Sequence, residues 1–152
     1  MKKKHIIFTL GVAVLLMLVI TAFMFSSKNT SVHRLVTKQI SISDVNEIKL
    51  IRIDSQSLER EEVIITEPGD IRSILHNLNT IQLLKKHHSY IPVAPYRYDV
   101  LIQENQADRF GITFIDDHNL EIYDAQNAKD PFTRYEIKNG YNLDEIAEYF
   151  EA

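Results

Sequence analysis

The chain contains no cysteine among its 152 residues. This absence excludes disulfide frameworks, thiolate zinc sites, iron–sulfur clusters, cysteine nucleophiles and lipid anchors attached through a cysteine. Glycine is scarce as well, because only 4 glycines are present and one of them lies in the first apolar stretch. The sequence accordingly has no phosphate-binding glycine loop, no dinucleotide-binding fingerprint and no Gly-x-Ser-x-Gly nucleophile elbow.

Basic residues are fewer than acidic ones, with 17 Lys and Arg against 21 Asp and Glu. Affinity for nucleic acids comes mostly from neutralising phosphates, so this balance disfavours a nucleic-acid partner. No acidic residue precedes Lys28, and the part of the chain after residue 25 carries 14 basic and 21 acidic groups, a net charge of −7. We expect an anionic membrane surface to repel this part, which should therefore stand away from the bilayer.

Residues 6–25 form an apolar run without a charged side chain. A helix of about 20 residues spans the roughly 30 Å hydrocarbon core of a membrane. The run is longer than that of a secretory signal peptide, and it ends in bulky Phe23-Met24-Phe25 instead of the small residues of a cleavage site. A retained transmembrane anchor is therefore favoured over the alternative of a cleaved signal peptide.

The distribution of Lys and Arg sets the orientation of this anchor. Lys2, Lys3 and Lys4 precede the apolar run, and Lys28 is the only basic residue of the first eight that follow it. The positive-inside rule then places the amino terminus in the cytoplasm and everything after the run outside it. The predicted parts are a cytoplasmic stub (1–5), a transmembrane anchor (6–25), a flexible tether (26–43) and an extracytoplasmic domain (44–152).

The predicted outer domain alternates short apolar segments with turn signals. Residues 48–65 indicate a β-hairpin whose first strand alternates in two phases, which fits either a bulge or a strand buried on both faces. Thr66 is the expected N-cap of a helix with an apolar stripe, and Asn142 with Glu145 matches the start of a second amphipathic helix. The predicted order ββαβββββα indicates an α+β fold in which a mostly antiparallel sheet is covered on one side by two helices.

The segment between the third and fourth predicted strands is the candidate interaction loop. It combines cationic or titratable groups with tyrosines inside an otherwise acidic domain. Tyr is favoured at contact surfaces because it offers rigid area with a polar tip. The alternative is a loop that folds onto the sheet, with Ile91, Val93 and Tyr98 filling the core. The candidate residues are Lys85, Lys86, His87, His88, Tyr90, Tyr96 and Tyr98.

No residue set in the sequence indicates a metal, a cofactor or a catalytic site. His87 and His88 are adjacent and therefore lack the spacing of helical metal ligands. Asp117, Asn119 and Glu121 resemble the first ligands of a calcium loop, but the glycine at the sixth position and the acid at the twelfth are missing. The sequence thus predicts a protein without metal, cofactor or catalytic residues.

The layout resembles small single-span or lipid-anchored extracytoplasmic proteins of Gram-positive bacteria whose domain has no known function. The resemblance rests on Met1-Lys-Lys-Lys4 with the apolar run, on Ile48-Lys-Leu50, and on Ile65-Thr-Glu-Pro-Gly-Asp-Ile71 opening a helix that ends in Asn77-Leu-Asn79. It implies no catalytic or binding residue. Our first hypothesis is a non-enzymatic binding or interaction module on the outer face of the membrane, with an envelope protein or an anionic wall polymer as its partner. The alternatives are a cell-envelope hydrolase that uses scattered carboxylates and an accessory subunit of a membrane assembly.

Overall fold

The structure, a computed structural model, describes residues 16–17, 29–86 and 94–151. The predicted stub and all of the predicted anchor except Leu16 and Met17 lie outside these residues, and Leu16 and Met17 are helical. Among the residues that the structure describes, no helix has the length and apolar character needed to span a membrane. The prediction of an anchor therefore remains a prediction.

The described part of the domain is built on one sheet of eight strands in the order β1-β4-β8-β7-β6-β5-β2-β3. Every neighbouring pair is antiparallel. The strands are β1 (Asn29–Ser31), β2 (Val45–Asp54), β3 (Arg60–Ile65), β4 (Gln82–Lys85), β5 (Tyr96–Glu104), β6 (Ala107–Phe114), β7 (Asn119–Asp124) and β8 (Phe132–Ile137).

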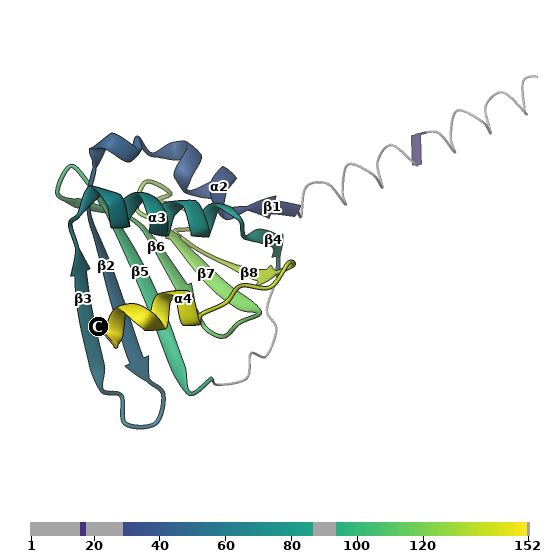
Figure 1. Cartoon of the computed structure of the whole chain (residues 1–152). Helices are drawn as coiled ribbons and strands as arrows, with labels where there is room; N and C mark the ends of the chain where they lie inside the picture. Colours follow the sequence, from purple (N-terminus) through teal and green to yellow (C-terminus); the bar gives the residue numbers. More distant parts are fainter. Residues whose placement is uncertain (1–15, 18–28, 87–93, 152) are drawn as a thin grey trace, which may run out of the picture.

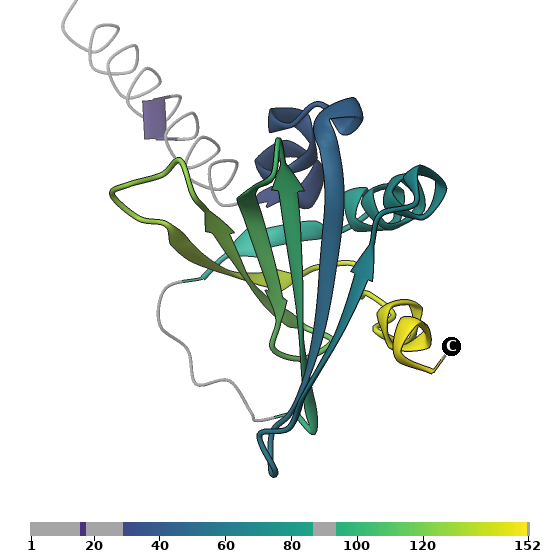
Figure 2. The ribbon, with the colours of Figure 1, turned by 90° about the vertical axis from the view of Figure 1, so that its left-hand side faces the viewer.

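The helices are short and gather on one side of the sheet. They are α2 (Val32–Leu35), α3 (Pro68–Asn79) and α4 (Asp144–Ala147), together with the 3-10 turns η1 (Thr37–Gln39), η2 (Ile42–Asp44) and η3 (Glu148–Phe150). Figures 1 and 2 show α3 and α4 on the same face of the twisted sheet. From β2 to α4 the order is the predicted ββαβββββα, which confirms the small antiparallel α+β domain.

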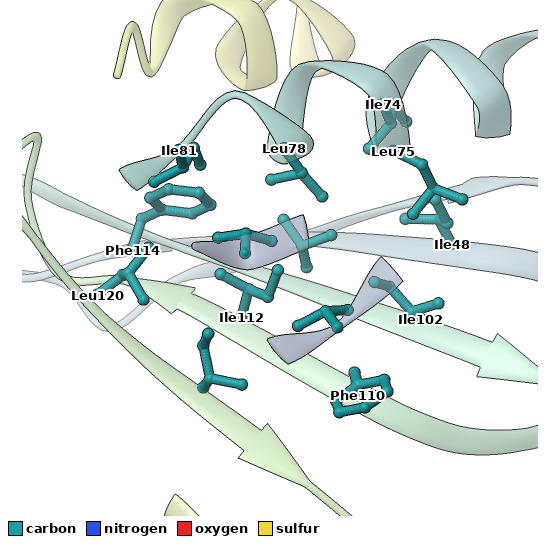
Figure 3. Packing of buried hydrophobic residues seen from close by; sticks show 14 of the residues in the cluster. Ile48, Ile74, Leu75, Leu78, Ile81, Ile102, Phe110, Ile112, Phe114 and Leu120 are labelled. Atoms are coloured by element: carbon teal, nitrogen blue, oxygen red, sulfur yellow. The ribbon is translucent and has the colours of Figure 1, made fainter. Parts of the chain in front are cut away.

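The core lies between the sheet and α3. Apolar residues at helical spacing on α3 point toward alternating residues of the central strands (Figure 3). Burial of such side chains contributes about 25 cal/mol per Å² of apolar surface removed from water. The residues drawn with labels are Ile48, Ile74, Leu75, Leu78, Ile81, Ile102, Phe110, Ile112, Phe114 and Leu120.

Strand β2 explains the two-phase alternation in its sequence. Its pairing with β3 is continuous from Ile48 to Ile53, and the register shift against β5 falls earlier, between Val45 and Glu47. Leu50 is 0% exposed on the helix-covered side, and Ile51 is only 4% exposed on the opposite side. The second of the two predicted alternatives, a strand buried on both faces, is therefore correct for this stretch.

The β5–β6 hairpin shows how turn chemistry fixes the register of the sheet. Asn105 and Gln106 both have positive φ angles, 53° and 67°. Two consecutive residues of this kind make the two-residue turn whose twist matches that of the flanking strands. The turn places Phe110, Ile112 and Phe114 on the covered face, where all three are buried.

The prediction of a flexible tether over residues 26–43 is wrong for its described part. Residues 29–31 pair with β4, and Val32 and Val36 in the following turns are fully buried in the core. The amide of Val32 also donates to the carbonyl oxygen of Ile81 at 3.1 Å. The folded domain thus includes the described residues from Asn29 on instead of starting near Asp44, because the apolar side chains of this stretch cover an end of the core.

The start of each predicted helix shifts by one position. Glu67, not Thr66, is the N-cap of α3, and Pro68 occupies the first turn. Leu143 is the N-cap of α4, while the Asn142 side chain accepts a hydrogen bond from the amide of Asp144 at 3.1 Å. Both helices nevertheless carry the predicted apolar faces, because packing against the sheet and not capping determines their position.

Candidate interaction surface

The candidate interaction loop divides into two separate places in the fold. Lys85 and Lys86 lie at the end of β4, whereas Tyr96 and Tyr98 lie at the start of β5. Strands β8, β7 and β6 separate β4 from β5, so at about 4.8 Å per strand the two ends are roughly 19 Å apart. His87, His88 and Tyr90 are outside the described residues.

A recess of about 290 Å³ lies where β4 ends beside β8, and we call it the β8 recess. It contains three cationic side chains, two acidic ones, an aromatic ring and a hydroxyl group. The residues that line it are Lys85, Lys86, Glu121, Asp130, Phe132, Thr133 and Arg134.

The register of two strand pairs assembles the β8 recess. Lys85 lies opposite Tyr135, and the amide of Lys86 donates to the carbonyl oxygen of Arg134 at 3.1 Å. On the other side of β8, Glu121 of β7 lies opposite Arg134. Residues nearly 50 positions apart in the sequence therefore meet through ordinary backbone pairing.

Ion pairs fix most of the charged groups around the β8 recess. Lys86 Nζ lies 2.6 Å from Glu136 Oε2, and Arg134 Nε lies 3.3 Å from Glu121 Oε2. The hydrogen bond from Lys86 is the main reason why the pKa of the Glu136 carboxyl is lowered. Lys85 forms no ion pair with any residue of the described ranges. Lys85 is thus the cation at this site that a ligand could engage without breaking an existing pair.

An exposed aromatic pair borders the β8 recess on the sheet face opposite the helices. The rings of Phe132 and Tyr123 lie 4.9 Å apart between centroids, and Phe132 is 56% exposed. Gly111 lies opposite Tyr123 in the pairing of β6 with β7. A side chain at Gly111 would crowd both Tyr123 and Leu101, so glycine allows these two side chains to lie against the strand. Large exposed rings are costly to leave in water and are enriched where proteins bind partners.

Tyr96 and Tyr98 belong to a different cluster, centred on Arg52. The Arg52 guanidinium lies 5.5 Å from the Tyr96 ring centroid and 5.0 Å from that of Phe150, and it bonds Glu61 at 2.6 Å. Tyr98 is only 7% exposed, and burial raises the pKa of its hydroxyl. This arrangement holds the C-terminal turn η3 against the sheet. Tyr98 therefore fills the core, as the predicted alternative had it, while Tyr96 remains exposed.

In the turn that resembles a calcium loop, the carboxylates form hydrogen bonds with other groups of the same turn. The Asp116 carboxylate accepts from the His118 amide at 2.8 Å and from the Asn119 side-chain amide at 2.9 Å. Asp117 bonds the His118 ring and raises the pKa of that imidazole, while Glu121 is engaged by Arg134. Asp116, Asp117 and His118 are close enough to share an ion, but their contacts are those of a β-turn.

Sequence reasoning missed Phe132, Arg134 and Tyr123 as surface residues. Each stands in a strand with ordinary alternation. No local signal in the sequence shows which face of such a strand stays open to solvent and which face other elements cover. Comparison with known proteins found nothing: no protein-family model, no curated protein and no solved structure matches the chain. The chemistry of the site therefore rests on its own residues.

Proposed function

We propose that the protein is a membrane-anchored binding module that acts outside the cytoplasm and has no catalytic activity. Its anchor is the apolar run of residues 6–25, with the amino terminus inside the cell. Its binding surface is the β8 recess together with the Tyr123–Phe132 pair. The observation that carries the proposal is this exposed aromatic pair at the edge of a recess that Lys85 also lines.

The mixed charges of the β8 recess favour a protein partner over a wall polymer. Glu121 and Asp130 line the same space as the three cations, and these carboxylates would repel a uniformly anionic chain. A protein segment can instead place an acidic side chain against Lys85 and an apolar one against Phe132. The proposed partner is therefore an envelope protein with an acidic and apolar contact segment.

The two alternative functions have less support. A hydrolase that uses carboxylates as acid and base requires a carboxyl group whose pKa is raised. The pKa values of Asp54 and Glu136 are instead lowered, the first by backbone amides of the adjacent turn and the second by Lys86. A role as an accessory subunit that acts through its membrane helix has no specific support from the described residues.

Photo-crosslinking in intact cells tests the binding proposal. The full chain carries a benzophenone amino acid in place of Phe132, and a control carries it in place of Leu58, which is exposed in the β2–β3 turn. We expect a discrete adduct from position 132 only, lost when Lys85→Glu is added, with unchanged thermal unfolding. Peptides of a second protein in the tryptic digest of the adduct identify a protein partner. An adduct whose added mass is removed by wall hydrolases identifies a polymer and refutes the preference above. Equal adducts from both positions, or no effect of Lys85→Glu, would remove the β8 recess from consideration.

A further inference from the structure

The first strand of the domain lies very close in the sequence to the end of the predicted anchor. Only residues 26–28 separate Phe25 from Asn29, where β1 begins. The four steps from Phe25 to Asn29 reach at most about 14 Å when fully extended. If the proposed anchor spans the membrane, the end of the domain that carries β1 and α2 lies at the bilayer surface.

This end of the domain differs in charge from all the rest. Residues 26–43 contain three basic residues and no acidic one, whereas residues 44–152 contain 11 basic and 21 acidic residues, a net charge of −10. The acid-free segment folds as β1, α2, η1 and the start of η2 at one end of the sheet, opposite the β2–β3 turn (Figures 1 and 2). The acid-free segment therefore gathers at one end of the folded domain, and the acidic residues lie in the rest of it.

The basic side chains of this segment are available to a ligand. Val32 and Val36 point into the core, and His33, Arg34 and Lys38 are left exposed. Arg34 and Lys38 form no ion pair within the described part of the chain. We call the surface made by His33, Arg34 and Lys38 the α2 face.

Acidic groups approach the α2 face from two sides. Asp44 closes η2, and Glu104 of the β5–β6 hairpin accepts a hydrogen bond from the amide of Ser41 at 3.3 Å. On the other side, Asp124 and Asp130 line a small pocket together with Leu35 and Gln39, and Asp124 is paired there with Arg109. Within the described residues, none of these four acidic residues forms an ion pair with Arg34 or Lys38, so these two side chains keep their positive charge for a ligand.

We propose that the α2 face docks on the anionic lipid headgroups of the membrane that holds the anchor. This inference rests on the proposed anchoring and adds a fixed orientation to it. A basic side chain near an anionic bilayer gains about fivefold in its binding equilibrium, and the effect acts within a Debye length of about 10 Å. The short connection holds Asn29 near the surface, and α2 and η1 follow β1 directly, so Arg34 and Lys38 are the basic groups of the domain best placed to reach the headgroups, while the acidic remainder is turned away from the surface. The domain then stands directly on the bilayer with the β2–β3 turn pointing outward, which replaces the expectation from net charge alone that the outer part stands away from the membrane.

Fluorescence quenching in vesicles tests the orientation. Because the chain has no cysteine, Gln39→Cys and Gln56→Cys each give a single labelling site, next to the α2 face and in the β2–β3 turn respectively. The full chain is reconstituted into vesicles of phosphatidylcholine with one third phosphatidylglycerol and a headgroup spin-labelled lipid as a short-range quencher. The ten residues of β2 separate the two sites by about 33 Å. We therefore expect strong quenching at position 39 and weak quenching at position 56.

Charge variants supply the decisive comparison. The double variant Arg34→Gln, Lys38→Gln should shift the docked-to-undocked ratio about 25-fold toward the undocked state and lower the quenching at position 39. The matched control is the double variant Arg60→Gln, Arg97→Gln, which removes the same two positive charges at the far end of the sheet, where both residues lie opposite Ile53. This control should leave the quenching at position 39 unaltered. Equal quenching at positions 39 and 56, or no response to the first variant, overturns the docking inference.

Flotation of the same vesicles separates this result from failure of the anchor. Protein that floats with vesicles after a carbonate wash, yet shows equal quenching at both positions, refutes docking alone. Protein that does not float refutes the anchor and the docking together. Protein that floats and is quenched at position 39 only in vesicles that contain phosphatidylglycerol confirms both.

Discussion

The burial of Val36 offers the sharpest test of where the folded domain begins. Val36, which links α2 to η1, is 0% exposed and belongs to the core. Val36→Ala removes two methyl groups from the core and leaves a small cavity. Burial of each such group contributes about 0.8 kcal/mol to the free energy of unfolding. We expect the free energy of unfolding to fall by about 2 kcal/mol, which lowers the melting temperature by roughly 8 °C for a domain of this size. If residues 29–43 were a tether, the same substitution would change nothing.

The measurement is chemical and thermal unfolding of the full chain in detergent micelles, followed by circular dichroism. Ile42→Ala is the matched control, because Ile42 belongs to the same segment but is 45% exposed. Its effect should stay within about 0.5 kcal/mol. Identical unfolding midpoints for Val36→Ala, Ile42→Ala and the parent would refute the assignment of this segment to the core.

Three further predictions follow from individual contacts. Arg109→Met should destabilise the domain by about 2–3 kcal/mol in urea unfolding, because it leaves its partner Asp124 without a counter-charge; adding Asp124→Leu should recover part of the loss. Burial is the main cause of the raised pKa of Tyr141. Tyrosines of the unfolded chain ionise above about pH 10 while Tyr141 of the folded chain stays protonated, so the free energy of unfolding should fall above that pH. Urea unfolding at several pH values should show a smaller fall for Tyr141→Phe. Gly140 has a φ of +70°, so Gly140→Ala should lower the melting temperature by an amount equivalent to about 1 kcal/mol, and an unchanged value would contradict the strain argument.

The sheet and its two main helices were predictable because their signals are local. Alternating apolar residues mark β5 and β6, and the stripe of α3 repeats at helical spacing. The first folded segment lacks such a signal, since its turns are too short to establish any period. Val32 and Val36 become core residues only through β1 pairing with β4, a contact between segments about 50 positions apart.

The candidate surface was predictable only in part, for a similar reason. Lys85 and Lys86 stand out in the sequence by their charge, and the structure places both in the β8 recess. Phe132 joins them through the pairing of β4 and β7 with β8, which depends on the order of strands in the sheet. Tyr96 and Tyr98 lie on the same face of β5, as their alternation predicts, but Tyr98 lies opposite the buried Phe114 whereas Tyr96 is the first residue of the strand and stays 43% exposed.

Topology labelling in intact cells tests the central claim of an anchored outer domain most directly. Ala128→Cys introduces one thiol on the exposed connection between β7 and β8, and a membrane-impermeant maleimide reports its side of the membrane. We expect full labelling of intact cells, with the labelled protein in the membrane fraction and the mass of the whole chain. Labelling only after the cells are permeabilised, or a mature product that begins after residue 25, would contradict the account.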